Sequence, residues 1–371
     1  MHCYLVPKSF LLRQNYIEFR ENFLKRANLL KIFDLGSNIF KSATNEVIIL
    51  IFENKKNNLN RDLFIYDFPK NLTNIYKNQE FDNLKRCINQ ECQLINRAKN
   101  FYPYSYSNTC IFCNKPNESL NRIRIKPTSR ILKIIEKMEK KADLNYLNVK
   151  DFPKMIRGEE AEGLKLLRKF IKENTQNSCF FLNAKKDITY YHFTKRKSFN
   201  IKNISPKVLK GSNYEYYLRP KLIIKHNKIV PETVFTIECT SFTSSVYSLL
   251  HDKDSELKYL CGCLNSLPIQ FYCTFGINNQ KDTTINLNQY MIRHLPIPRL
   301  ENKEKLIIAK LVDEIIADLK KSNIQLKNMV KENLSKIDNF FMNFFEIEEE
   351  DKNFMKNEIG DRIDWFKKIY K

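Results

Sequence analysis

The stretch YLRPKLIIKHNKIVPETVF (217–235) contains two short runs of β-forming residues on either side of a polar turn. This pattern predicts a strand, a turn and a second strand. On the first strand Lys221, Ile223 and Lys225 share one face, and Arg219, two residues earlier, projects to the same side of an extended chain. A basic strand face suits contact with a phosphate backbone, and it equally suits plain exposure to solvent. We favour the phosphate contact.

The sequence that follows predicts further strands and a buried helix. FTIECTSFTSSVYSLL (235–250) is β-rich, and LKYLCGCLNSLPIQFYC (257–273) reads as a helix. Asn265 is interpreted as a cap or turn residue in preference to a base reader, and His294 as a structural residue. The helix residues predicted to be buried are Leu260, Cys261, Cys263, Leu264 and Phe271.

The C-terminal part of the chain is predicted to be helical. RHLPIPRL (293–300) ends regular strand pairing at its prolines. Apolar residues then recur at helical spacing over 303–330, and an aromatic-rich helix face follows in SKIDNFFMNFFEIEEEDKNFM (335–355). We expect these helices to pack on the preceding domain or on a partner helix.

The N-terminal part of the chain alternates between helix and strand patterns. Residues 6–36 read as a loop, an amphipathic helix and a short strand. EVIILIFENK (46–55) is an apolar run of the kind found in buried strands, and DLFIYDF (62–68) is a candidate for another. This alternation of helix and strand patterns is typical of the edge of an α/β sheet.

Four cysteines have the spacing of a metal site. Cys87, Cys92, Cys110 and Cys113 form a C-x4-C-x17-C-x2-C pattern, and the second pair is followed by turn residues. That arrangement predicts zinc bound by four thiolates, although the first pair has a wider spacing and a partly helical setting. Alternatively, the thiols are buried in a small apolar turn. A redox dithiol is disfavoured because no thioredoxin-like strand–helix unit surrounds the cysteines.

Composition points to a globular protein with a polyanionic partner. The chain has 371 residues, 43% of them hydrophobic, and a formal net charge of +21. Such a charge favours nucleic acid over a membrane surface. A lysine-, asparagine- and isoleucine-rich sequence is also expected from an AT-rich genome, which raises the lysine content without any role in binding.

The sequence predicts a cytoplasmic protein. No apolar run approaches the length of a membrane helix, and the N-terminus lacks the features of a signal peptide. Ten cysteines in a chain of this size, without a secretory signal, indicate reduced thiols or metal ligands. Seven glycines limit the possibilities for a phosphate-cradling loop.

The order of these segments resembles the C-terminal part of TaqI-type adenine-specific DNA methyltransferases and fused restriction–modification enzymes. VPKSFL (6–11), IFDLGSNIF (32–40) and ILIFENKK (49–56) resemble the end of the family's catalytic domain. The segments that resemble its target-recognition domain and closing helices are RGEE (157–160), KVLKGSNYEYY (207–217), LNS (264–266), LPIP (295–298) and residues 335–355. The family has a basic residue before the final Tyr of the second segment, where this chain has Glu215 or Tyr216.

The residues that would carry catalysis in this family are missing. No Asn/Asp-Pro-Pro-Tyr/Phe tetrapeptide occurs, and neither does a glycine-rich turn for S-adenosylmethionine. Asp34-Leu35-Gly36 matches such a turn only superficially. We therefore assign no catalytic or cofactor-binding residues and expect the chain alone to be inactive.

The resemblance implies an α/β and α+β fold with four parts. These are a remnant of a Rossmann-like methyltransferase sheet (1–75), a connector with the possible four-cysteine zinc site (76–150), a mixed α/β target-recognition domain (151–300) and C-terminal helices (301–371). The residues expected to contact DNA are Arg157, Lys210, Arg219, Lys221 and Lys225.

The function implied is sequence-specific recognition of duplex DNA in an adenine methylation or restriction–modification system. S-adenosylmethionine and the catalytic loop would belong to a missing segment, which could be a separate methyltransferase chain. Two alternatives remain at this point: a complete but divergent adenine-specific methyltransferase, and a non-catalytic zinc-containing interaction protein.

Overall fold

The computed structural model describes residues 1–36, 39–40, 46–54, 62–68, 72–76, 83–92, 101–148, 152, 155–173, 179–205, 212–277, 286–321 and 328–370. The chain forms two compact units, each built from segments that are distant in sequence. Unit 1 comprises Met1–Leu94, Ala98–Lys140 and Thr274–Ile285, and unit 2 comprises Ile95–Arg97, Lys141–Cys273 and Asn286–Lys371. The four-part division given above stays a prediction.

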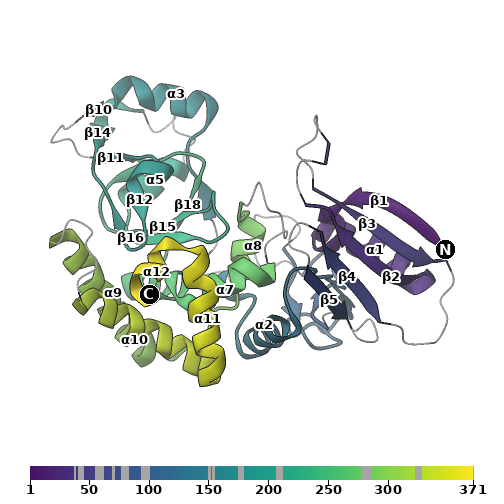
Figure 1. Ribbon diagram of the computed structural model, residues 1–371. Coiled ribbons are helices and arrows are strands. Elements are labelled where there is room, and N and C mark those ends of the chain that lie inside the picture. Colours follow the sequence, from purple (N-terminus) through teal and green to yellow (C-terminus); the bar gives the residue numbers. More distant parts are fainter. Residues whose placement is uncertain are drawn as a thin grey trace. The chain divides into compact units, whose positions relative to one another are not determined.

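The centre of unit 1 is a mixed sheet with the strand order β1-β3-β2-β4-β5 (Figure 1). Its strands are β1 (His2–Pro7), β2 (Asn28–Asp34), β3 (Val47–Glu53), β4 (Leu63–Asp67) and β5 (Leu72–Tyr76). β3 runs antiparallel to both β1 and β2, whereas β2 and β4 are parallel. The strands predicted around 30–35, 46–55 and 62–68 are therefore confirmed.

One face of this sheet is packed and the other is partly open. The packed face contributes Ile32, Ile48 and Leu50 to a buried cluster, beside helix α1 (Ile17–Arg26). On the opposite face Leu5 and Phe64 are 49% and 36% exposed. A strand as apolar as β3 is typical of a sheet covered on both faces. Within the described residues of unit 1, only one face has that cover.

A second, smaller sheet in unit 1 contains Cys87, the first of the four cysteines. Its strands are β6 (Lys85–Cys87), β7 (Tyr104–Ser105) and β8 (Asn117–Ser119), in the order β7-β6-β8. Helix α2 (Ser129–Lys141) follows. Cys87 ends strand β6, so the partly helical setting expected for the first cysteine pair is wrong.

Unit 2 contains several short sheets. The first has the order β16-β15-β18-β9, formed by β9 (Met155–Arg157), β15 (Lys221–Lys225), β16 (Glu232–Thr236) and β18 (Val246–Leu249). The second has the order β10-β14-β11-β17, formed by β10 (Lys172–Glu173), β11 (Cys179–Leu182), β14 (Lys197–Phe199) and β17 (Thr240–Phe242). A hairpin joins β12 (Ile188–Thr189) and β13 (His192–Phe193).

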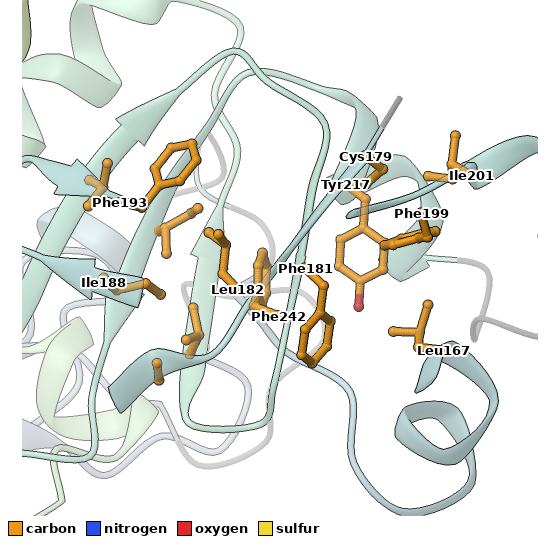
Figure 2. Close-up of a cluster of buried hydrophobic side chains, with 14 of the residues drawn as sticks. Leu167, Cys179, Phe181, Leu182, Ile188, Phe193, Phe199, Ile201, Tyr217 and Phe242 are labelled. Atoms are coloured by element: carbon orange, nitrogen blue, oxygen red, sulfur yellow. The ribbon is translucent and has the colours of Figure 1, made fainter. Parts of the chain in front are cut away.

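One hydrophobic core joins the two larger sheets of unit 2. Phe181 of β11, Phe242 of β17 and Ile223 of β15 belong to it, and Tyr217 of helix α5 (Ser212–Leu218) lies beside Phe199 (Figure 2). Helices α3 (Ala161–Phe170) and α4 (Ala184–Asp187) also contribute to this core. The β15 strand therefore has protein on the face that carries Ile223.

Helices cover the other face of the β15 sheet. Helix α6 (Asp254–Asn265) packs against β15 and β16 and against α9 (Asn302–Lys321). Gly262 allows this contact, because a Cβ there would lie 2.7 Å from Ile308 Cγ2. The remaining helices of the region are α7 (Leu267–Tyr272), α8 (Gln289–Arg293), α10 (Asn328–Phe344), α11 (Glu349–Arg362) and α12 (Asp364–Tyr370).

Two local predictions need correction. The helix expected over 257–273 is divided, since α6 ends at Asn265 and α7 begins at Leu267 with Pro268 in its first turn, where proline is best tolerated. The strand expected from residue 217 begins at Lys221, after helix α5. The fold is nevertheless a mixed α/β arrangement with C-terminal helices, as predicted. Within the described residues, no helix is both long and apolar enough to cross a membrane.

Candidate nucleic-acid interface and four-cysteine cluster

Two motifs that are far apart in sequence meet inside unit 2. The hydroxyl of Tyr217 donates a hydrogen bond to Glu159 Oε1 at 2.9 Å across a separation of 58 residues. Both side chains are buried. Glu159 belongs to the RGEE motif, and Tyr217 ends the KVLKGSNYEYY motif. The two motifs thus form one structural junction, a contact that spacing alone does not reveal.

Glycines make this junction possible. A Cβ on Gly158 would lie 2.3 Å from the Thr243 carbonyl oxygen, and one on Gly163 would lie 2.0 Å from Glu159 Oε2. Neither separation is compatible with a side chain larger than hydrogen, unless the neighbouring atoms move. Glu159 also donates its backbone N–H to the Phe242 carbonyl at 2.8 Å. The RGEE motif is therefore held against β17, and its Arg157 starts from a fixed backbone.

Arg157 and Arg219 expose their guanidinium groups. The Arg157 side chain is 53% exposed, donates to the Ser244 carbonyl and lies 3.5 Å from Glu160. The Arg219 side chain is 41% exposed and pairs with Glu215 at 2.9 Å. The hydrogen bond from Arg219 to Glu215 raises the arginine pKa. Arg219 also pairs with Asp252 at 3.2 Å, so two carboxylates neighbour this cation, and both arginine side chains are partly exposed to solvent.

The exposed basic strand face predicted for Lys221 and Lys225 is wrong. Lys221 is 0% and Lys225 3% exposed, because the face they share with Ile223 packs on the core between the two sheets. Strand alternation identifies the residues that share a face, but it does not tell whether another layer covers that face. Neither lysine presents an ammonium group to an external phosphate in this conformation.

Each buried lysine has internal partners. Lys221 donates to the carbonyl oxygens of Arg219 at 2.8 Å and Glu238 at 2.9 Å, and burial lowers its pKa to about 8. Lys225 donates to Glu232 at 2.7 Å, directly across the strand pair, and to the Ile188 carbonyl at 2.9 Å. Burial lowers the Lys225 pKa as well. These contacts tie the ends of β15 to neighbouring segments.

The remaining residues singled out in this region divide into two groups. Lys210 lies outside the described residues. Asn265 is buried and clamps β16, because its side chain accepts from Thr233 N and donates to Thr233 O, each at 2.9 Å. His294 is buried and lies 3.0 Å from the Leu144 carbonyl. Asn265 and His294 are therefore structural, as predicted.

The four cysteines of unit 1 converge on one point. All four sulfur atoms lie within 4.8 Å of one another, with Cys87 and Cys113 at 3.6 Å and Cys92 and Cys110 at 3.7 Å. A tetrahedral zinc ion with Zn–S bonds of about 2.3 Å requires sulfur atoms about 3.8 Å apart. The cluster therefore has the donor atoms and the size that a zinc ion needs.

Local backbone geometry holds the thiols in position. Cys110 donates its N–H to the Lys115 carbonyl at 2.8 Å, and Asn114 adopts a left-handed conformation that turns the chain between them. The hydrogen bond from the Lys115 N–H lowers the Cys113 pKa to about 6. Burial instead raises the pKa of Cys87 to about 11.

Asp34, the first residue of the superficial Asp-Leu-Gly match, has its hydrogen-bond partners inside unit 1. Its carboxylate is buried and accepts from Lys8 Nζ at 2.6 Å and from the Gly36 N–H at 3.1 Å. Glu46 lies 3.3 Å from the same lysine. These contacts join the ends of β1 and β2 and give Asp34 a structural role.

The fold and the motif junction define a small mixed α/β domain with close packing at its glycines and exposed arginines at its surface. Residues 183–297 match the family described as the TaqI-like C-terminal specificity domain. The resemblance to a target-recognition domain, predicted from the order of the sequence segments, is thereby confirmed for these residues.

Several solved structures are similar to the chain, whereas no curated protein matches it. The type IIL restriction–modification enzyme MmeI in complex with DNA shares 9% identity at a TM-score of 0.48, over 93% of this chain and 47% of that one. The type IIG restriction endonuclease BpuSI shares 12% sequence identity at a TM-score of 0.35, over 92% of this chain and 47% of that one. A structure of a type I restriction–modification system shares 16% sequence identity at a TM-score of 0.28, over 52% of this chain and 42% of that one. The chain spans about half the length of these chains.

Proposed function

We propose that this protein recognises a specific sequence in duplex DNA as part of an adenine methylation or restriction–modification system. The observation that carries the proposal is the match of residues 183–297 to a specificity domain. The net charge of +21 supports it, because a basic protein gains affinity for DNA by releasing condensed counterions. Surface loops of unit 2 would read base edges, and basic side chains would hold the backbone.

Fewer residues are now proposed to contact phosphate than the sequence suggested. Arg157 and Arg219 both have partly exposed side chains, so we retain both. Lys221 and Lys225 are assigned to the fold instead, because their ammonium groups are bonded internally. Lys210 stays a proposal on sequence grounds alone.

Methyl transfer would require a catalytic segment outside these 371 residues. The family transfers a methyl group from S-adenosylmethionine to the adenine amine, and its Asn/Asp-Pro-Pro-Tyr/Phe loop holds the flipped base. This tetrapeptide is absent from the 371 residues. We therefore propose that the chemistry resides on a separate or fused catalytic segment, and that the sheet of unit 1 is the edge of a methyltransferase sheet. The support for the second point is the order β1-β3-β2, in which a reversed strand lies between two parallel ones.

The four-cysteine cluster is proposed to bind one structural zinc ion. Cys87, Cys92, Cys110 and Cys113 would supply four thiolates, which close the coordination sphere and leave no position for a substrate. Such a site would fasten β6 to the turn before β8. Its chemistry is structural, so no reaction step is assigned to it.

Duplex selection tests the proposed function directly. The purified chain is incubated with a randomised duplex library at low salt, bound DNA is amplified, and affinity for the enriched sequence is measured as salt rises. We expect a preferred sequence and an affinity that falls steeply with salt. Absence of duplex binding at low salt would overturn the proposal and favour a zinc-containing interaction protein. Transfer of a tritiated methyl group by the chain alone would overturn the assignment of catalysis to another segment.

A further inference from the structure

Two cysteines of unit 2 lie opposite each other where strands β11 and β17 begin. The strands are parallel, and their first registered pair is Phe180 with Thr240. Cys179 and Cys239 each precede that pair by one residue, and the Phe180 N–H donates to the Cys239 carbonyl at 2.9 Å. Successive residues of a strand alternate between its two faces, so residues at matching positions of paired strands share a face. The two thiols therefore lie side by side on one face of this sheet.

This placement suits a disulfide bond. Paired strands lie about 4.8 Å apart, and the Cα atoms that a disulfide joins are about 4.4–6.8 Å apart. Both cysteines are free thiols in this structure, and a hydrogen bond already links their side chains. A bond between the two sulfur atoms therefore needs rotation of the side chains and little movement of the backbone.

The two thiols differ in access and in acidity. Cys179 is fully buried in the core drawn in Figure 2, whereas Cys239 is half-buried and packs against that core. The hydrogen bond that Cys179 donates lowers the pKa of Cys239. Burial raises the pKa of Cys179 well above its usual range. Cys239 therefore has the stronger thiolate character and the better access to solvent, and Cys179 stays protonated.

A fixed cation lies near the more reactive thiol. The Lys221 ammonium group donates to the carbonyl of Glu238, the residue before Cys239, at 2.9 Å. Its positive charge favours the thiolate form of Cys239, in addition to the hydrogen bond from Cys179. An accessible thiolate with a cation and a second thiol beside it is the arrangement in which cysteines react with peroxides. Metal binding explains the pair less well, because in the part of the chain that the structure describes only the unit 1 cluster gathers three or more possible ligands.

We propose that Cys239 and Cys179 form a reversible disulfide when the protein meets a peroxide. The Cys239 thiolate attacks one oxygen of hydrogen peroxide, the O–O bond breaks, and the departing hydroxide takes up a proton to become water. Cys179 then attacks the sulfur of the Cys239 sulfenic acid, so that the S–S bond forms, the S–O bond breaks and a second water leaves with the Cys179 proton. Exchange with a small-molecule thiol, which is itself oxidised to its disulfide, restores both thiols. The site does not rest on DNA recognition, because neither cysteine is proposed to contact DNA.

Peptide mapping tests the bond. The full chain is treated with an equimolar amount of hydrogen peroxide, the remaining thiols are alkylated, and the protein is digested with trypsin without reduction. Trypsin leaves Cys179 as the one cysteine of peptide 173–185 and Cys239 as the one cysteine of peptide 229–253, and the unit 1 cluster falls on other peptides. We expect these two peptides to be cross-linked and to be released by dithiothreitol. Alkylation of both thiols in place of the cross-link would overturn the proposal.

Serine variants assign the two roles. In Cys179→Ser the sulfenic acid on Cys239 has lost its resolving thiol, so dimedone should trap it at Cys239. In Cys239→Ser dimedone should leave Cys179 unlabelled, because that thiol is buried. Circular dichroism verifies that each variant is folded. Where Cys179→Ser does not fold, dimedone present during oxidation of the wild type gives the same readout.

Cys3 is the internal control, because it is exposed whereas Cys239 is half-buried. At low peroxide, dimedone should label Cys239 several-fold faster than Cys3, since the rate follows thiolate character and not exposure alone. Faster labelling of Cys3, or labelling of Cys179 ahead of Cys239, would contradict the proposed reaction.

Discussion

The unit 1 sheet and the β16-β15-β18-β9 sheet of unit 2 are both built on apolar strands, yet they are covered to different extents. Every residue of β15, β16 and β18 is buried, because α6 lies on one face and the core shared with β11 and β17 lies on the other. In unit 1 the corresponding second face and the β1 edge remain partly exposed.

The comparison shows that strands of similar apolar composition occur both in a sheet that is buried on both faces and in one that is partly exposed. In unit 2, helix α6 and the hydrophobic core cover the two faces of the sheet, and Lys221 and Lys225 are buried as well. Unit 1 also contains the four-cysteine cluster, which we propose to hold a zinc ion. The predictions below test that contrast, beginning with the largest expected effect.

If the four cysteines bind zinc as proposed, chelation should destabilise unit 1 and leave unit 2 folded. Zinc bound by four thiolates in small domains contributes about 10–16 kcal/mol of apparent binding free energy, much of which is folding free energy. We expect about one zinc per chain by elemental analysis, and early exchange of amide hydrogens in residues 83–120 after chelation or in Cys110→Ser. Cys3→Ser is the control, since Cys3 is exposed and outside the cluster. A zinc content well below one per chain would remove the metal from the proposal.

Replacing Lys221 and Lys225 together by Ala should destabilise unit 2. The change leaves the carbonyls of Arg219, Glu238 and Ile188 without their donors, and we expect the free energy of unfolding to fall by about 2–5 kcal/mol. Urea denaturation followed by circular dichroism measures the loss. Unchanged stability with weaker DNA binding would instead restore the exposed strand face that the sequence predicted.

A buried carboxyl should make unit 2 sensitive to pH. Asp338 accepts hydrogen bonds from Leu267 N and from Tyr370, thereby joining α10 to α7 and α12, and burial raises its pKa to about 7. The folded state thus binds more protons than the unfolded state, so this group stabilises the fold below about pH 4. Its contribution, up to about 4 kcal/mol, is lost as pH rises towards 7.

The test is the stability of wild type and Asp338→Asn from pH 4 to pH 8. The asparagine retains an acceptor for Leu267 N but does not titrate, so the slope with pH should flatten in the variant. Asp338 lies outside unit 1, and amide exchange in that unit should not follow the same profile. An equally steep slope in the variant would assign the pH dependence to other residues.

Replacing Arg157 and Arg219 together by Ala should affect DNA binding and not stability. Both side chains are partly exposed and their ion pairs lie at the surface, so we expect a change in unfolding free energy within about 0.5 kcal/mol. If each contacts one phosphate, the slope of log affinity against log salt should flatten by about two units on random-sequence duplex. Lys25→Ala with Lys336→Ala is the matched control, because each of these lysines is also exposed and paired with a neighbouring glutamate. An unchanged slope would move the DNA-contacting surface elsewhere.

Local sequence determined a large part of this protein. The cysteine spacing indicated the cluster because a turn with two closely spaced thiolates can be recognised without tertiary contacts. Helical spacing identified Leu260, Leu264 and Phe271 as buried, since periodicity reports the packed side of a helix. The order of short segments indicated the specificity domain that residues 183–297 match.

Only the tertiary structure decided the roles that depend on what covers a face or what meets across the fold. Lys221 and Lys225 are buried because a second sheet packs on their side of β15, and alternation along a strand carries no information on that second layer. Glu159 meets Tyr217 through chain segments 58 residues apart, a contact that arises from the packing of α5 and β17 around glycine. The apolar run of β3 indicated a sheet covered on both faces, and the fold showed that the described residues of unit 1 leave one face partly exposed.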